Sequence, residues 1–135
     1  MLRTNWLVAA AVALLACGDV THAQAPQHRI VVQNYYYALP GKSEEVYELR
    51  LHASAVRASL GLARGRVLRR TADPAAKAPS PPLPDVIWEC EYASATARES
   101  DVAALGRSEE FQQIEKRMDS LLEHFQRALF TISGE

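Results

Sequence analysis

Two stretches of the sequence share one local design, and their placement constrains the fold more than any other feature. Each begins with Ser-Glu-Glu, at Ser43 and again at Ser108, and continues with apolar residues spaced alternately three and four positions apart. A serine in this position caps a helix, and glutamates in the first turn interact favourably with the helix dipole. The spacing gathers the apolar residues on one helical face. We therefore predict two amphipathic helices, the first with Gly61 and Gly65 bracketing its end and the second running to Phe125.

Strand patterns flank both predicted helices. Residues 30–39 are rich in β-branched and aromatic side chains and end at a Pro-Gly turn signal, and residues 85–92 alternate between two faces. Weaker strands are predicted at 66–71 and 128–132, and a short alanine-rich helix at 96–105. The order strand, helix, strand thus occurs twice. It predicts an α+β fold of the ferredoxin-like βαββαβ type, a four-stranded antiparallel sheet with helices on one face.

The remaining long segment, residues 72–84, is predicted to be an exposed loop. It carries five prolines in thirteen residues, which excludes a helix or an inner strand.

One face of the predicted sheet has no cover in this chain. It nevertheless carries large apolar groups in either register of the strands, and an exposed apolar surface of that kind marks an interface. We therefore predict a homodimer in which two sheets meet face to face and enclose a cavity.

Residues 1–23 have the features of a cleavable signal peptide. Arg3 precedes an eleven-residue apolar run, Leu7 to Cys17, which is too short to span a membrane, and Ala23 offers a small residue before the cut. We expect a periplasmic or secreted protein that begins at Gln24. Two alternatives stay open: lipidation at Cys17, because Leu14 to Cys17 is similar to a bacterial lipobox, and an uncleaved anchor helix. No later run is long enough for a membrane span.

Length and composition narrow the remaining possibilities. A chain of 135 residues fits one domain, here 24–135 after the signal peptide, and an apolar content of 48% argues against disorder. The 15 basic and 16 acidic residues nearly balance, which argues against a nucleic-acid-binding protein. Removal of residues 1–23 leaves Cys90 alone, so no internal disulfide is expected. Cys90 has no local base or cation, and we predict a buried structural thiol.

Three side chains on neighbouring strands are candidates for lining a ligand cavity. Alternation places Asn34 and Tyr36 on the same face of their strand, and Trp88 lies on an apolar face of its own strand. A buried asparagine needs hydrogen-bond partners and can orient a ligand. In the alternative interpretation, the tyrosines are packing and rim groups of a dimer interface.

The charged residues allow two interpretations. Arg66 and Arg70 share a face of the second strand and are suited to an anionic substrate group, with Arg50 or Arg57 as further candidates. Alternatively, the arginines of the second strand pair with Glu89 and Glu91 across the sheet, and the charges have no further role.

The histidines do not indicate a metal site. His28, His52 and His124 are not spaced as a metal-binding pair, so neither a metal nor another cofactor is predicted. His52 lies beside the apolar stripe of the first helix and is a candidate cavity residue or general base. His124 is expected near the end of the last helix, where a cation is favoured.

Several segments resemble the dimeric α+β barrel superfamily. They are Tyr-Ala-Leu-Pro-Gly-Lys at 37–42, Trp-Glu-Cys-Glu-Tyr-Ala-Ser at 88–94 and Ser-Glu-Glu-Phe at 108–111. The chain is most similar to NIPSNAP-type members and next to antibiotic-biosynthesis-monooxygenase-type members, over residues 29–132. The resemblance implies a ferredoxin-like fold that pairs into a barrel. Asn34 matches a functional asparagine of the monooxygenase and haem-degrading members. Ile114 stands where the haem-degrading members have their histidine ligand, so haem chemistry is not expected.

The function predicted from these observations is an exported, NIPSNAP-like homodimer that binds a small molecule and has no clear catalytic residues. The alternative is a cofactor-independent, monooxygenase-like enzyme acting on a small aromatic or enolic substrate. In that case Asn34 and Tyr36 would orient the substrate and Trp88 would pack on it, with water excluded by the cavity. A purely structural dimer with a filled barrel is a third possibility.

Overall fold

The structure of the chain is a computed structural model that describes residues 28–79 and 81–133. The predicted signal peptide, with Cys17, lies outside the described residues. In chain order the elements are β1 (Ile30–Ala38), α1 (Ser43–Ser59), β2 (Arg66–Arg69), β3 (Val86–Tyr92), α2 (Ala95–Gly106), α3 (Glu109–Asp119) and β4 (Leu122–Thr131).

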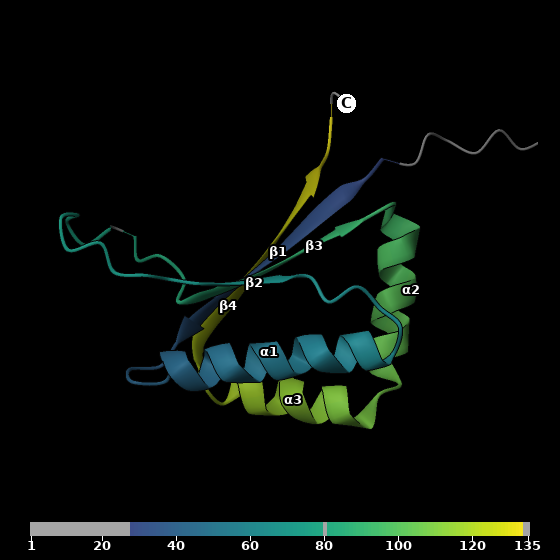
Figure 1. The fold of residues 1–135 in the computed structure, drawn as a ribbon, viewed down its shortest axis with the longest axis horizontal. Coiled ribbons are helices and arrows are strands. Elements are labelled where there is room, and N and C mark those ends of the chain that lie inside the picture. Colours follow the sequence, from purple (N-terminus) through teal and green to yellow (C-terminus); the bar gives the residue numbers. More distant parts are fainter. Residues whose placement is uncertain (1–27, 80, 134–135) are drawn as a thin grey trace, which may run out of the picture.

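The four strands form one antiparallel sheet in the order β2-β3-β1-β4. Helices α1 and α3 lie side by side against one end of the sheet, and α2 stands at the end of β3 (Figure 1). Both strand-helix-strand units are present, and a four-stranded sheet with its helices on one face is the ferredoxin-like arrangement. The fold class predicted from the sequence is confirmed.

The core lies between the sheet and the helices. Alternate residues of β1 and β3 are buried beneath the helices, because successive side chains of a strand point to opposite faces. A second cluster joins the three helices, with buried Ala53, Leu105 and Phe111 among its members. Ser94 and Ser108 cap α2 and α3 through their hydroxyl groups, whereas the start of α1 has no side-chain cap. The expected capping by Ser108 is therefore present, and that by Ser43 is not.

The predicted extent of the last helix is wrong. Helix α3 ends at Asp119, a turn follows, and β4 begins at Leu122, so the last strand is longer than the predicted 128–132. The helical spacing continues to Phe125 in the sequence, but residues 122–125 belong to β4, which pairs with the whole length of β1. Tertiary pairing therefore overrides the local pattern. His124 accordingly lies on a strand, where its ring stacks on that of Tyr37 with centroids 3.8 Å apart.

The proline-rich segment is an exposed connection between the adjacent strands β2 and β3, as predicted. In its described part, residues 70–79 and 81–85, it contains no helix or strand and extends away from the body of the molecule (Figure 1). No helix in the described part of the chain is long and apolar enough to cross a membrane.

The face of the sheet that points away from the helices, here called the open face, combines apolar and polar side chains. Strand register places Tyr35 beside Ile87, and Leu68 follows Ile87 on the other side. Next to these apolar residues, the Tyr35 hydroxyl donates to the side-chain oxygen of Gln33. The side-chain nitrogen of Gln33 in turn donates to the Glu89 carboxylate. Arg66 forms an ion pair with the same glutamate. Of the two interpretations of these arginines, cross-strand pairing with a glutamate of β3 is therefore correct for Arg66. Arg70 pairs with Asp85 instead.

Candidate functional site

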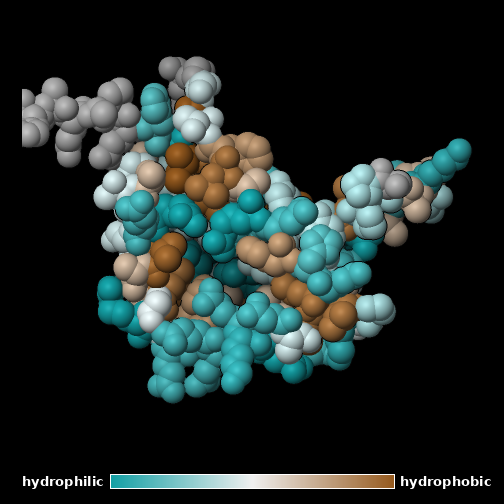
Figure 2. Space-filling model, turned by 180° about the vertical axis from the view of Figure 1, so that it is seen from behind, coloured by the Kyte–Doolittle hydropathy of each residue, from teal (hydrophilic) through white to brown (hydrophobic). Residues whose placement is uncertain are grey.

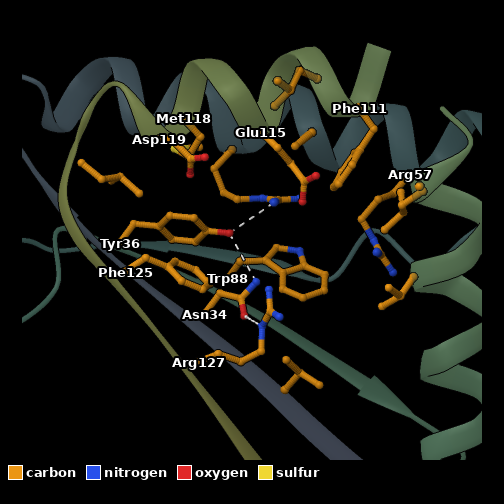
Figure 3. Close-up of a pocket in the computed structure, with 18 of the residues that line it drawn as sticks. Asn34, Tyr36, Arg57, Trp88, Phe111, Glu115, Met118, Asp119, Phe125 and Arg127 are labelled. Atoms are coloured by element: carbon orange, nitrogen blue, oxygen red, sulfur yellow. Dashed lines mark hydrogen bonds between the residues drawn. The ribbon is translucent and has the colours of Figure 1, made fainter. Parts of the chain in front are cut away.

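A cavity of about 440 Å³ lies between the sheet and the three helices. Its volume is in the range of small-molecule sites. Figure 2 shows the molecule hollowed in the middle of the face seen from behind, with hydrophilic surface inside the hollow and hydrophobic patches beside it. The side chains that surround the cavity come from every helix and from β1, β3 and β4, and ten of them are labelled in Figure 3: Asn34, Tyr36, Arg57, Trp88, Phe111, Glu115, Met118, Asp119, Phe125 and Arg127.

Arg50 is the least satisfied polar side chain of this cavity. It projects from α1 and is only 6% exposed. One guanidinium nitrogen, Nη1, donates to the Tyr36 hydroxyl at 3.3 Å, but Nε and Nη2 are buried and have no hydrogen-bond partner among the described residues. An unpaired buried cation is costly. The arrangement therefore leaves a positive charge and two guanidinium nitrogens without an acceptor in the wall of the cavity.

The Tyr36 hydroxyl is the meeting point of a short chain of hydrogen bonds. Arg127 Nε donates to Asn34 Oδ1 at 2.9 Å, and Asn34 Nδ2 donates to the Tyr36 oxygen at 3.4 Å. Because Arg50 also donates to this oxygen, the hydroxyl accepts twice, and its own proton has no acceptor in the described part of the chain. Chains of hydrogen bonds polarise their members, which makes the proton a better donor. We call the Tyr36 hydroxyl and the two unpaired guanidinium nitrogens of Arg50, Nε and Nη2, the oxyanion site.

Trp88 forms a fixed wall beside the oxyanion site. It lies directly across the β1–β3 ladder from Asn34, and its Nε1 donates to the carbonyl of Arg64 at 2.9 Å. The guanidinium carbons of Arg50 and Arg57 lie 5.1 Å and 4.9 Å from the centre of its ring. Gly65 has φ +71°, and a Cβ there would lie 2.4 Å from Trp88 Nε1. Glycine is therefore required at this close approach.

Arg57 differs from Arg50 because its charge is neutralised. It forms an ion pair with Asp101 at 2.8 Å, donates to the Tyr92 hydroxyl at 3.1 Å, and donates through Nε to a backbone carbonyl. Burial raises the pKa of Tyr92 to about 12, against a smaller opposing effect of Arg57. Burial also raises the pKa of the Cys90 thiol, so the thiolate needed for nucleophilic chemistry is disfavoured. Cys90 is buried, as predicted for a structural thiol.

Two carboxylates stand at the mouth of the cavity. Glu115 and Asp119 are one helical turn apart on α3, and Figure 3 shows both above the Tyr36 ring. Burial raises the pKa of Glu115, and the nearby charge of Asp119 raises it further, against the opposing effects of Arg127 and Arg50. The rest of the mouth is partly apolar and exposed, with Phe125 on β4 and Val102 on α2.

The structure brings three of the predicted site residues together and separates two from them. Asn34, Tyr36 and Trp88 all line the cavity. Arg66 does not, because the alternation of β2 directs it to the open face, where it pairs with Glu89. His52 does not line it either, since it points outward from α1 and contacts Glu110 at 3.0 Å. This cavity lies within one chain, on the side of the sheet covered by the helices, and not between two sheets.

Several cavity residues escaped the sequence prediction. Glu115 and Asp119 each follow a residue of the apolar stripe of α3, so their position beside the core could have been inferred. Arg127 could not, because the segment from residue 120 to 125 was assigned to a helix. The sequence pattern indicates Arg50 only as a possible partner of an anion. A stronger signal is its spacing of seven residues from Arg57, which places two arginines on the buried stripe of α1.

No three His, Cys, Asp or Glu side chains within residues 28–79 and 81–133 gather into a group that could hold a metal ion.

Comparison with known proteins identifies the fold. No protein-family model matches the chain, and no curated protein sequence matches it. A solved structure of a NIPSNAP family protein from Agrobacterium tumefaciens is similar, with 20% identity over 81% of this chain and 90% of that one and a TM-score of 0.57. A dimeric protein of unknown function with a ferredoxin-like fold from Bacteroides fragilis is also similar, with 12% identity over 77% and 96% of the two chains and a TM-score of 0.55.

A candidate antibiotic biosynthesis monooxygenase from Bacteroides thetaiotaomicron has 14% identity over 79% of this chain and 90% of its own, with a TM-score of 0.54. The fold is therefore that of the NIPSNAP family protein and of the monooxygenase-like structure.

Proposed function

We propose that this protein is an exported, NIPSNAP-like homodimer that binds a small organic anion in the cavity of each chain. The observation that carries the proposal is the oxyanion site. Arg50 is 6% exposed and has two guanidinium nitrogens without hydrogen-bond partners, and the Tyr36 proton beside them is also unused. A carboxylate or enolate oxygen would accept all three donors, and it would neutralise the buried charge.

The remainder of the cavity indicates what the anionic group is attached to. Trp88, Phe111, Ile114 and Met118 contribute apolar and aromatic walls. Pockets of this kind hold the body of a ligand by apolar contact and fix its orientation through a few polar groups. The ligand class that fits is therefore a small carboxylate or enolate with an aromatic or branched apolar body.

The open face supports the homodimer. Leu68 and Phe130 are 43% and 50% exposed there, and Tyr35 and Ile87 are only partly covered. A solved protein with the same fold is described as dimeric. A second copy would cover this apolar area, as two sheets packed face to face do.

Export rests on residues 1–23 alone. Native mass spectrometry of the protein from its own envelope fraction tests both the export and the assembly. A dimer beginning at Gln24 is expected. A lipidated Cys17 at the N-terminus would establish the lipoprotein instead. A chain that begins at Met1 would contradict cleavage of the signal peptide, and a monomer would contradict pairing.

The anion site is tested by fluorescence titration of the full chain carrying Trp6→Phe, so that Trp88 is its only indole. The ligands are benzoate, phenylacetate and 3-phenylpropanoate, each compared with the alcohol of the same skeleton. We expect at least one carboxylate to bind more tightly than its alcohol. Arg50→Met should weaken that carboxylate by about 10- to 100-fold, the effect of losing a charged hydrogen bond.

The matched control is Arg66→Met, which removes an arginine from the other face of the sheet and should leave the affinity unchanged. The proposal is wrong if no carboxylate binds, if acid and alcohol bind equally, or if Arg50→Met binds as the native chain does.

A second candidate is a cofactor-independent, monooxygenase-like enzyme. The observation in its favour is that Asn34, Tyr36 and Trp88 line the same cavity, where they could orient an enolic or aromatic substrate. The measurement is oxygen uptake above the background rate with 1,4-dihydroxynaphthalene as a probe. Uptake that falls in Asn34→Ala supports this candidate, whereas no uptake, or uptake unaltered by Asn34→Ala, counts against it.

A further inference from the structure

One cavity residue has no part in the anion site, and its position indicates a chemical role. Glu115 projects from α3 toward the cavity, on the side opposite the sheet residues Asn34 and Tyr36 (Figure 3). It forms no hydrogen bond or ion pair within the described part of the chain. Its charge nevertheless interacts with those of Arg50 and Arg127, so it is near both ends of the hydrogen-bond chain that leads to Tyr36. A carboxylate without a structural partner thus faces a set of donors without acceptors.

The surroundings of Glu115 make it a stronger base than an ordinary surface glutamate. Partial burial raises its pKa first, and the charge of Asp119 on the same face of α3 adds to the effect. The charged groups on the other elements around the cavity are Arg50 on α1 and Arg127 on β4, which act in the opposite direction, Arg98 on α2, and the Arg57–Asp101 pair, which is neutral as a unit. A general base is most effective when its pKa approaches the working pH.

We propose that the oxyanion site holds the C2 oxygen of an aromatic 2-oxo acid, next to its carboxylate, and that Glu115 takes a proton from C3, so that the cavity interconverts the keto and enol forms of this acid. This inference rests on the proposed anion binding and adds a reaction to it. The ligand class follows from the site: an oxygen that can carry negative charge, a neighbouring C–H bond, and an aromatic body beside Trp88.

The step balances without a cofactor. The bond between C3 and its hydrogen breaks, and the proton goes to a Glu115 carboxylate oxygen. The electron pair of that bond forms the C2=C3 double bond, and the C=O π pair moves to the C2 oxygen. Tyr36 and Arg50 donate to this enolate oxygen, as donors that are oriented in advance stabilise a developing charge. Water at the cavity mouth then protonates the oxygen, and Glu115 returns its proton to water.

The experiment follows loss of the C3 protons of phenylpyruvate in D₂O by NMR, with the full chain and with buffer alone. Native protein should exchange these protons faster than buffer. Glu115→Gln should reduce the protein-dependent rate by about 100-fold or more, the usual contribution of a general base. The binding of the phenyl carboxylates, measured by Trp88 fluorescence, should persist in this variant. Glu115→Asp keeps a carboxylate and should recover part of the rate.

Glu110→Gln is the matched control, because Glu110 lies on the same helix but pairs with His52 outside the cavity, and its rate should equal that of the native chain. The inference is overturned if native protein exchanges no faster than buffer, or if Glu115→Gln exchanges as fast as native protein, while the phenyl carboxylates still bind. In that case the anion site stands. If no phenyl carboxylate binds to the native chain, the proposed anion site is wrong, and this inference is overturned with it.

Discussion

The two faces of the sheet carry the same three kinds of polar group but satisfy them differently. On the open face, Tyr35 donates to the amide of Gln33, which donates to Glu89, and Arg66 pairs with the same carboxylate. On the helix side, Tyr36 accepts from the amide of Asn34 and from Arg50, and Glu115, the carboxylate that faces them, forms no hydrogen bond or ion pair with them. A tyrosine, an amide and an arginine thus form a closed network on one face and an open one on the other.

The difference shows that burial, and not residue type, distinguishes a candidate binding site from an ordinary hydrogen-bond network on the surface. The side chain of Arg66 is 73% exposed, so water solvates whatever its partner leaves free. Arg50 is only 6% exposed, so water does not solvate its unpaired nitrogens in the same way. A protein that retains an unpaired arginine in its interior has either a ligand for it or an unexplained loss of stability.

The sharpest test of this comparison is to remove one paired arginine from each face. Arg57→Ala leaves Asp101 as a largely buried charge without its partner and should reduce the free energy of unfolding by about 3 to 5 kcal/mol. Arg66→Ala breaks an exposed ion pair and should leave the free energy of unfolding nearly unchanged. Urea unfolding of both variants measures the difference. Equal losses would show that burial does not distinguish the two pairs.

The open face can be tested by placing a charge in its apolar part. Ile87→Arg puts a cation between Tyr35 and Leu68, so in a sheet-to-sheet homodimer it should weaken association by about 30-fold or more, as at an interface hot spot. Leu60→Arg changes a leucine just after α1 that is as exposed as Leu68 but lies away from the open face, and it should have no effect. Sedimentation over a range of concentrations reports the dissociation constant. If Ile87→Arg associates as tightly as the native chain, the partner copy does not use this face.

The smallest expected effect concerns pH and the helix side only. Because the pKa of Glu115 is raised, this carboxylate gains a proton at a higher pH than usual as the solution is acidified. Its negative charge at the cavity mouth then disappears, while Arg50 stays charged. The affinity for 3-phenylpropanoate should therefore rise as pH falls from 8 toward 5.5, by about threefold, as expected for a solvent-screened charge. Fluorescence titration across this range should show no such rise in Glu115→Gln; a rise that persists in the variant would assign it to another group.

The alternation of β1 and β3 made half of the site predictable. A period of two places Asn34, Tyr36 and Trp88 on the faces where the structure has them, because register and burial preserve that period. The same rule places Arg66 on the opposite face, but its side could not be related to that of Trp88 until the pairing of β2 with β3 was known.

The β4 half of the site was not predictable from local pattern. Met118, Leu121 and Phe125 continue the helical spacing, so the sequence favours a helix where the structure has a turn and a strand. The pairing of this segment with β1 is a non-local interaction, and no short window of sequence contains it. Arg127 reaches Asn34 only because of that pairing, across 93 positions of the chain.

The proline-rich connection between β2 and β3 has a practical consequence. Adjacent antiparallel strands need only a few residues to join them, yet this connection is long, exposed over residues 70–79 and 81–83, and directed away from the body of the molecule (Figure 1). Lengthening an already open loop adds little conformational cost. The segment is therefore a natural point at which to insert an affinity tag or a fluorescent domain, leaving the cavity and the open face unobstructed.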